Sequence, residues 1–291
     1  PWTDARRVME AAVSFAQDDF SALHYEVTDY FNIYTYQLGI VFPLEILARL
    51  FPKADLNLLA QCVNAALGIA GAGVLAALAQ ELLDRRAASA TLLLYIASLP
   101  TLLFAQFVYN INLMILLGAG ATLCFARYAR TGRAGFGLAY AALAGLATVA
   151  KPNAEIVLLA LLICALLHGW ANRDVKIVLF VALSFAIGKG AFAAVAAWYG
   201  KQGGVDFRAN VSMLARLAMG MQESPVAAGW YNKYIEQFFA ADVTAQQEKA
   251  QALAAIGARL GWMRENPAAA LAFYREKLLT QWLEPACDML W

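Results

Sequence analysis

Six apolar segments, each about as long as a membrane span, follow one another between residues 57 and 199. They cover residues 57–82, 89–108, 111–126, 134–150, 153–169 and 176–199. A helix rises about 1.5 Å per residue, so about 20 apolar residues cross the ~30 Å hydrocarbon core of a bilayer. With 62% hydrophobic and 15% charged residues, the chain is too apolar for an ordinary soluble domain. The sequence therefore predicts an all-α integral membrane protein, and its net charge of +1 argues against nucleic acid as a partner.

The turns between these segments alternate in charge. The basic turns contain Arg85 and Arg86, then Arg127, Arg130 and Arg133, then Arg173 and Lys176. The other turns, Tyr109-Asn110 and Lys151-Pro152-Asn153, carry almost no charge. Basic loops tend to stay on the cytoplasmic side of a membrane. The alternation therefore predicts that these two turns and both terminal regions share the outer face.

This topology divides the chain into three regions. Residues 1–56 are predicted to form the first outer loop with juxtamembrane helices, residues 57–199 the transmembrane bundle, and residues 200–291 an outer region. The chain has neither an initial Met nor a signal peptide. We therefore expect it to be part of a longer membrane protein, truncated at both ends.

Three shorter stretches outside the spans have their own patterns. Residues 38–51 are apolar but too short to span, which favours a helix lying at the membrane interface. Residues 243–265 repeat apolar positions every three to four residues, and Asn266 with Pro267 then begins a second helix. Residues 200–232 are rich in glycine and aromatic residues and are predicted to be loop-like.

Asp4 is the first candidate for chemistry. An aspartate just outside a membrane cavity can take a proton from an acceptor hydroxyl, as a general base does. A Thr-Asp pair is also a favoured N-cap, here for a helix predicted over residues 5–17. Both interpretations remain open, and they are compatible.

Lys151 is the only cation of its turn, on the side where positive charge is unusual. One interpretation is that it binds an anion such as phosphate, because Pro152 and Asn153 begin the next helix and leave backbone N–H groups beside the ammonium. The common alternative is a lysine that only reaches toward the lipid headgroups.

Two further groups combine aromatic and amide side chains. Tyr109-Asn110 lies between apolar spans, where an amide can bind a sugar or phosphate or can stabilise a tight turn. Trp230-Tyr231-Asn232 has the composition of a sugar-contacting loop, and equally that of an aromatic anchor at the membrane surface.

The order of these features resembles the GT-C fold, the family of membrane glycosyltransferases that use lipid-phosphate sugars, and within it the bacterial family 39, protein-mannosyltransferase-like type. The matching stretches are Tyr34-Thr35-Tyr36-Gln37-Leu38-Gly39, Phe107-Val108-Tyr109-Asn110, Gly145-Leu146-Ala147 leading to Lys151-Pro152-Asn153, Met219-Gly220-Met221-Gln222-Glu223, Gly229-Trp230-Tyr231-Asn232 and Gln281-Trp282-Leu283-Glu284-Pro285. Each stretch is short, but together they extend over most of the chain.

The resemblance implies an inverting hexosyltransferase of the bacterial plasma membrane, with its active site on the outer face. The donor would be a polyprenyl-phosphate-linked sugar and the acceptor a glycan, lipid or protein of the cell envelope. Asp4 would be the catalytic base, and Lys151 with Asn153 would bind the donor phosphate. Substrate contacts would come from Tyr36, Gln37, Tyr109, Asn110, Trp230, Tyr231 and Asn232. Members of this type often have a carboxylate where Asn110 stands, so a second acid in this turn is not expected here.

Two other classes of function remain open from the sequence. A transporter or flippase of a lipid-linked or anionic substrate would also place a cation near a cavity, although Lys189 is the one clear charge inside the spans. A non-catalytic membrane partner would use its outer helices to bind another protein. No cofactor is indicated, and a divalent metal ion would require the fold to gather Asp4, Asp29 and Glu45.

Overall fold

The structure is a computed structural model that describes residues 3–24, 30–205, 207, 212–239 and 243–283. Every regular element within these ranges is a helix, so the predicted all-α class is confirmed. The chain divides into two compact units. The first contains Pro1–Ser21 and Tyr36–Val205, and the second contains Ala22–Thr35 and Asp206–Trp291. Most of the predicted first outer loop therefore belongs to the same unit as the apolar helices.

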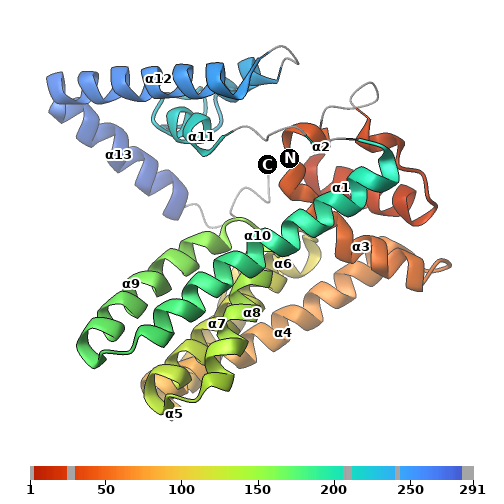
Figure 1. The fold of residues 1–291 in the computed structure, drawn as a ribbon, viewed down its shortest axis with the longest axis vertical. Coiled ribbons are helices and arrows are strands. Elements are labelled where there is room, and N and C mark those ends of the chain that lie inside the picture. Colours follow the sequence, from red (N-terminus) through yellow and green to blue (C-terminus); the bar gives the residue numbers. More distant parts are fainter. Residues whose placement is uncertain (1–2, 25–29, 206, 208–211, 240–242, 284–291) are drawn as a thin grey trace. The chain divides into compact units, whose positions relative to one another are not determined.

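Four helices among the described residues are long and apolar enough to cross a bilayer. They are α4 (Leu56–Leu82), α7 (Ile111–Thr131), α9 (Ala154–Asn172) and α10 (Val175–Gly203), all labelled in Figure 1. Their length and composition are those of a helical membrane protein, as the sequence predicts. Large apolar side chains on α9, such as Ile156 and Leu167, are exposed and would face lipid.

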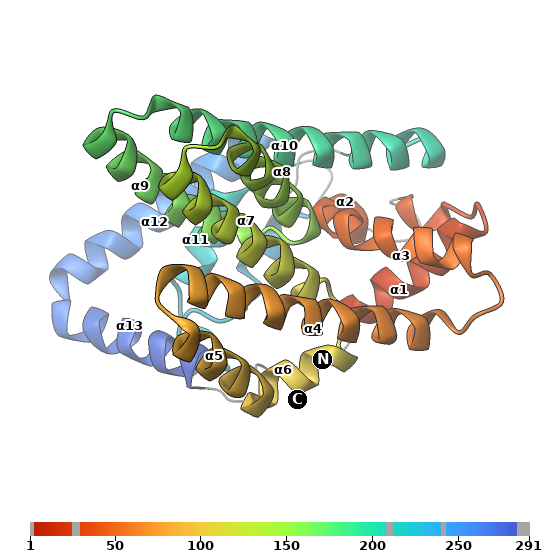
Figure 2. The ribbon, with the colours of Figure 1, turned by 90° about the horizontal axis from the view of Figure 1, so that it is seen from below.

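Two of the predicted spans have other forms. The range 134–150 is one helix, α8 (Ala134–Ala150), which is apolar but shorter than the four spanning helices. The range 89–108 contains α5 (Arg85–Ala97) and α6 (Leu99–Gln106), bent by 61° at Ser98 (Figure 2). Pro100 lies in the first turn of α6 and has no N–H to bond back into α5, so the helix breaks there.

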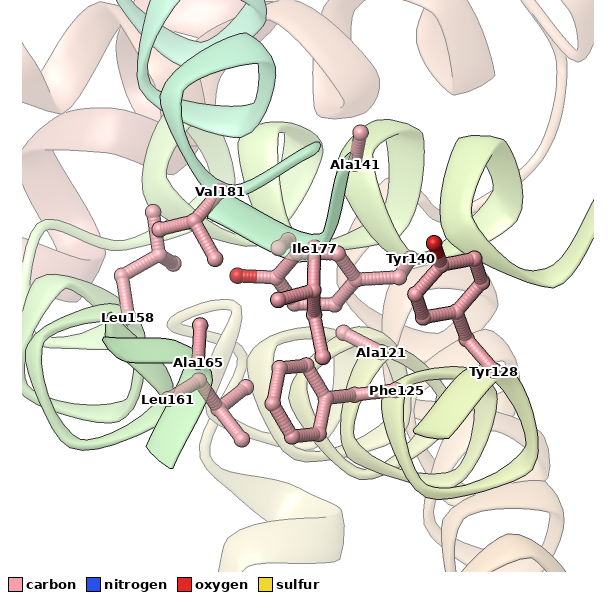
Figure 3. Close-up of a cluster of buried hydrophobic side chains, with 11 residues drawn as sticks. Ala121, Phe125, Tyr128, Tyr140, Ala141, Leu158, Leu161, Ala165, Ile177 and Val181 are labelled. Atoms are coloured by element: carbon pink, nitrogen blue, oxygen red, sulfur yellow. The ribbon is translucent and has the colours of Figure 1, made fainter. Parts of the chain in front are cut away.

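The core of the first unit lies among α7, α8, α9 and α10 (Figure 3). Its largest fully buried member is Tyr140, whose ring meets Phe125 edge to face. Small residues bring α8 and α10 close together: a Cβ atom added at Gly145 would lie 2.8 Å from the Ser184 carbonyl oxygen. Close packing through small residues is typical of helices associating in membranes. This packing fixes the end of α8, which carries Lys151.

At the basic end of the bundle, α4 and α7 are joined by ion pairs. Glu81 accepts from Arg127 at 3.1 Å and from Arg130 at 2.5 Å. Both arginines lie near the end of α7, and Glu81 lies near the end of α4, just before the basic turn at Arg85. The ion pairs thus join the ends of two helices that lead into basic turns, as expected if alternate turns gather at one end.

Helices α1 (Thr3–Ala16) and α3 (Leu38–Leu50) pack against each other in the first unit. The buried residues of α1 recur every three to four positions and form one face: Val8, Ala11, Ala12 and Phe15. Helix α3 also contacts α4, α8 and α10, so the run at 38–51 is a packed helix of the bundle. Its placement at the membrane interface stays a prediction.

The second unit is built from short helices and two long ones. They are α2 (Tyr30–Ile33), α11 (Met213–Gly220), α12 (Ala245–Glu265) and α13 (Pro267–Trp282), with a 3₁₀ turn over Tyr234–Phe238. The predicted helices over 243–265 and from Pro267 are confirmed, and Thr244 with Gln247 forms a capping box for the first. The loop-like prediction for 200–232 is wrong at both places where helix forms, the end of α10 and α11. Ser212 caps α11 by accepting from the Ala215 N–H, a start signal that the flanking glycines obscure.

Candidate functional site

The two turns outside the basic set meet at one end of the first unit. The turn at Tyr109 joins α6 to α7, and the turn at Lys151 joins α8 to α9. Lys151 Nζ donates to the Tyr109 carbonyl oxygen at 3.4 Å. The structure therefore brings together the two turns that the charge alternation places on one face.

Asn110 fixes these turns to each other. Its backbone is left-handed, with φ of 56°, a conformation that asparagine tolerates better than most residues. Its buried side chain donates to the carbonyl oxygens of Ala150 at 3.3 Å and Gly39 at 3.4 Å. Gly39 is required at this contact, because a Cβ atom there would overlap the Val149 carbonyl oxygen. The amide thus ties the turn to α3 and α8, and substrate contact by this side chain stays a prediction.

Lys151 ends α8 and lies over the face of Tyr109. Its Nζ is 3.7 Å from the centre of the tyrosine ring, well inside the range of a cation–π interaction. No carboxylate among the described residues is within ion-pair distance of it. Burial lowers the pKa of Lys151 to about 8, and the charge of Asp4 opposes this shift. The site thus contains a half-buried cation with no ion-pair partner among the described residues.

Asp4 lies at the other side of the same tyrosine. It is exposed in the first turn of α1, and the Tyr109 hydroxyl donates to its Oδ2 atom at 3.4 Å. Burial raises the pKa of Tyr109 above its ordinary value, so this hydroxyl stays protonated and remains a donor. The N-cap interpretation of Asp4 is not supported by position, because Asp4 is already inside the helix.

Gln37 is the third residue in contact with the Tyr109 side chain. It ends the 3₁₀ turn Thr35–Gln37 just before α3 and is fully buried. Its Nε2 atom donates to the Tyr109 hydroxyl. Its Oε1 atom has no partner among the described residues. Tyr36, the neighbouring candidate, is half-buried.

Asn153 lies two positions after Lys151 and is exposed at the start of α9. Its side chain makes no capping bond, so it is not the side-chain cap that its type favours. Asp4, Gln37, Tyr109, Asn110 and Lys151 therefore form the compact group, and phosphate contact by Asn153 stays a prediction.

The remaining candidates belong to the second unit. Trp230 Nε1 donates to Thr280 Oγ1 at 3.2 Å, and the Tyr231 hydroxyl donates to Glu236 at 2.8 Å. Asn232 donates to the carbonyl oxygens of Met219 and Glu223. The polar atoms of this loop are thus used within their own unit, and sugar binding there stays a prediction. Two residues of the last matching stretch, Glu284 and Pro285, lie outside the described residues.

Sequence reasoning missed a second polar group in the first unit. Buried Glu45 accepts from Arg49 at 2.8 Å and from the Tyr199 hydroxyl at 2.6 Å. Arg49 also bonds Asp18 at 2.8 Å and the Phe15 carbonyl oxygen at 2.6 Å. Glutamate and arginine four residues apart on a helix were a usable signal for the first of these contacts. The contact with Tyr199 joins residues 154 positions apart and has no local signal.

This ion pair also bears on the metal question. Within the described residues, no three side chains of metal-ligating type are gathered. Glu45 is already occupied by Arg49 and Tyr199. Asp29, the third carboxylate considered from the sequence, lies outside the described residues.

Compared with protein-family models, with curated proteins and with solved structures, the chain matches none of them.

Proposed function

We propose that this protein is a membrane glycosyltransferase that moves a sugar from a polyprenyl-phosphate donor to an acceptor hydroxyl. The observation that carries the proposal is the grouping of one carboxylate and one uncompensated cation around Tyr109. Asp4 and Lys151 are far apart in the sequence, yet they contact the same side chain. A reaction that deprotonates one substrate and creates negative charge on another requires such a pair.

Each residue has a defined role in the transfer. Asp4 takes the proton of the acceptor hydroxyl while the acceptor oxygen attacks the anomeric carbon. The bond from that carbon to the phosphate oxygen breaks, and its electron pair stays on the phosphate. The products are an inverted glycoside, polyprenyl phosphate with one more negative charge, and protonated Asp4. Lys151 stabilises the charge that develops on the phosphate in the transition state.

The position of Lys151 suits a lipid-linked donor. It follows the last residue of an apolar helix and precedes α9, a candidate span. A phosphate at this depth leaves the polyprenyl chain in the hydrocarbon core and the sugar in water. Exposed Asp4 is then accessible to an acceptor that arrives from the aqueous side.

The direct test supplies purified protein in lipid with radiolabelled undecaprenyl-phosphate hexoses. Lipids, glycans and peptides of a bacterial envelope serve as acceptors. We expect undecaprenyl phosphate to be released only when a suitable acceptor is present, and Asp4→Asn to abolish the release. If no acceptor and no hexose supports release by the wild type, the proposal is wrong.

A second candidate, a transporter or flippase, is favoured by the broken pair α5 and α6, since interrupted helices often form transport sites. In those sites, however, free carbonyl groups bind the substrate or ion. Here Asn64 donates to three carbonyl groups near the end of α6, at 2.5–3.3 Å, and Asn112 donates to one of them. Lys189 is paired with Glu155 at 2.8 Å. This candidate would be favoured if Asp4→Asn, which should lack sugar transfer, still moved a labelled lipid-linked sugar across the membrane of a vesicle.

A further inference from the structure

We propose that Tyr109 is the positioning residue of this site, holding the Asp4 carboxylate with its hydroxyl and the Lys151 ammonium with its ring. The inference deepens the proposed function and depends on it. The two halves of the residue have separate tasks, so they can be removed one at a time.

The hydroxyl can serve Asp4 because its other hydrogen-bonding capacity is already used. Gln37 approaches as a donor, so the hydroxyl accepts from the amide and directs its own proton to the carboxylate. Among the described residues, the side chain of Asp4 is bonded by the Tyr109 hydroxyl, at Oδ2. Oδ1 is thereby left to take the acceptor proton. Gln37 is fully buried and thus holds the hydroxyl from a fixed point.

The ring of Tyr109 holds the Lys151 ammonium without neutralising its charge. A carboxylate partner would hold the ammonium firmly, but it would also cancel the charge that a phosphate needs. An aromatic face attracts a cation and carries no net charge. The Tyr109 carbonyl oxygen adds a neutral acceptor at 3.4 Å. Lys151 is therefore held in place while its full positive charge stays available to an anion.

The backbone around Tyr109 is fixed well enough for this task. Asn110 bonds the carbonyl oxygens of Gly39 and Ala150, so the turn is anchored to two helices. The ring of Phe107 packs 5.6 Å from the ring of Tyr109. A side chain anchored on both sides can set the distance between its two partners, which a mobile one cannot.

The test compares Tyr109→Phe with Tyr109→Leu in the full chain, in lipid. Phenylalanine keeps the ring and loses the hydroxyl, whereas leucine loses both. For Tyr109→Phe we expect kcat to fall about tenfold with the donor KM within about twofold of wild type. For Tyr109→Leu we expect the same loss of kcat and, in addition, about fivefold weaker binding of undecaprenyl phosphate. Tyr95→Phe is the matched control, because the Tyr95 hydroxyl has no partner among the described residues.

The outcomes separate this inference from the proposed function. If the wild type transfers no sugar, the proposed function fails, and the role of the hydroxyl fails with it. If the wild type is active and Tyr109→Phe equals Tyr95→Phe in kcat, only the positioning of Asp4 is wrong. If Tyr109→Phe and Tyr109→Leu bind undecaprenyl phosphate equally well, the role of the ring is wrong. Thermal unfolding of each variant shows whether a loss of activity is only a loss of fold.

Discussion

Glu45 is a buried and Lys151 a half-buried charged side chain of the first unit, and their surroundings differ. Glu45 has an opposite charge at 2.8 Å in Arg49 and a hydroxyl donor at 2.6 Å in Tyr199. Lys151 has an aromatic face and a carbonyl oxygen, both without net charge. A buried charge with its counterion is stable and needs nothing further. A half-buried cation without one remains able to bind an anion, and this difference supports the proposed phosphate contact at Lys151.

Asp4→Asn should have the largest effect. Removing a general base lowers the rate by about 10²–10⁴-fold, so we expect transfer to fall about a thousandfold. Stability should not change, because Asp4 is exposed and makes one long contact. The measurement is labelled sugar transfer together with thermal unfolding in detergent. Glu10→Gln, on the same helix in an exposed pair with Arg6, is the control and should retain full activity.

Glu45→Ala should lower the stability of the protein without changing its affinity for the donor phosphate. It leaves the buried Tyr199 hydroxyl without its acceptor, and an unpaired buried polar group costs about 1–3 kcal/mol, whereas Arg49 keeps Asp18 as a partner. We expect a clearly lower unfolding temperature, with unchanged affinity for undecaprenyl phosphate in the protein that remains folded. Glu10→Ala, which breaks an exposed pair, should cost under about 1 kcal/mol. Equal losses in the two variants would mean that Glu45 is not a structural charge.

Lys151→Met should give the opposite pattern. The folded pKa of Lys151 is lowered to about 8, so the folded state disfavours its charge, and at pH 7 that cost is fully present. Because the unfolded chain keeps more protons above pH 8, wild-type stability should also rise with pH until the ordinary lysine pKa is reached. Methionine removes the cost, so the unfolding temperature at pH 7 should rise, while affinity for undecaprenyl phosphate falls about tenfold or more. A lower unfolding temperature with unchanged affinity would make the lysine a structural residue.

The two sites also differ in how far the sequence predicts them. The apolar runs predict the helices, because burial and membrane crossing both depend on composition that is visible locally. Charge alternation also predicts that the turns at Tyr109 and Lys151 meet, since it fixes the end of the bundle at which each turn lies. The bond between Glu45 and Tyr199 depends on the packing of α3 against α10 and has no signal in either segment.

Local backbone geometry is a second feature of the fold that the amino-acid composition does not predict. The break between α5 and α6 at Ser98 and the left-handed backbone of Asn110 are local conformations that the residue types allow but do not dictate. Asn110 illustrates the limit well. Its type suggested either a turn or a substrate contact, and only the positions of Gly39 and Ala150 show that its amide is already used.

The pH dependence of donor binding should show the smallest effect and the most specific one. Binding is measured in the wild type with an undecaprenyl-phosphate hexose and no acceptor, so that no transfer occurs and the phosphodiester keeps the same charge across the range. As pH rises through about 8, free Lys151 loses its proton, so affinity should fall, by no more in total than the loss expected for Lys151→Met. Lys151→Arg stays charged, so its affinity should remain flat over the same range. If donor affinity changes with pH in the same way in the wild type and in Lys151→Arg, the ammonium does not contact the phosphate. Lys151 would then differ from Glu45 in its surroundings but not in function.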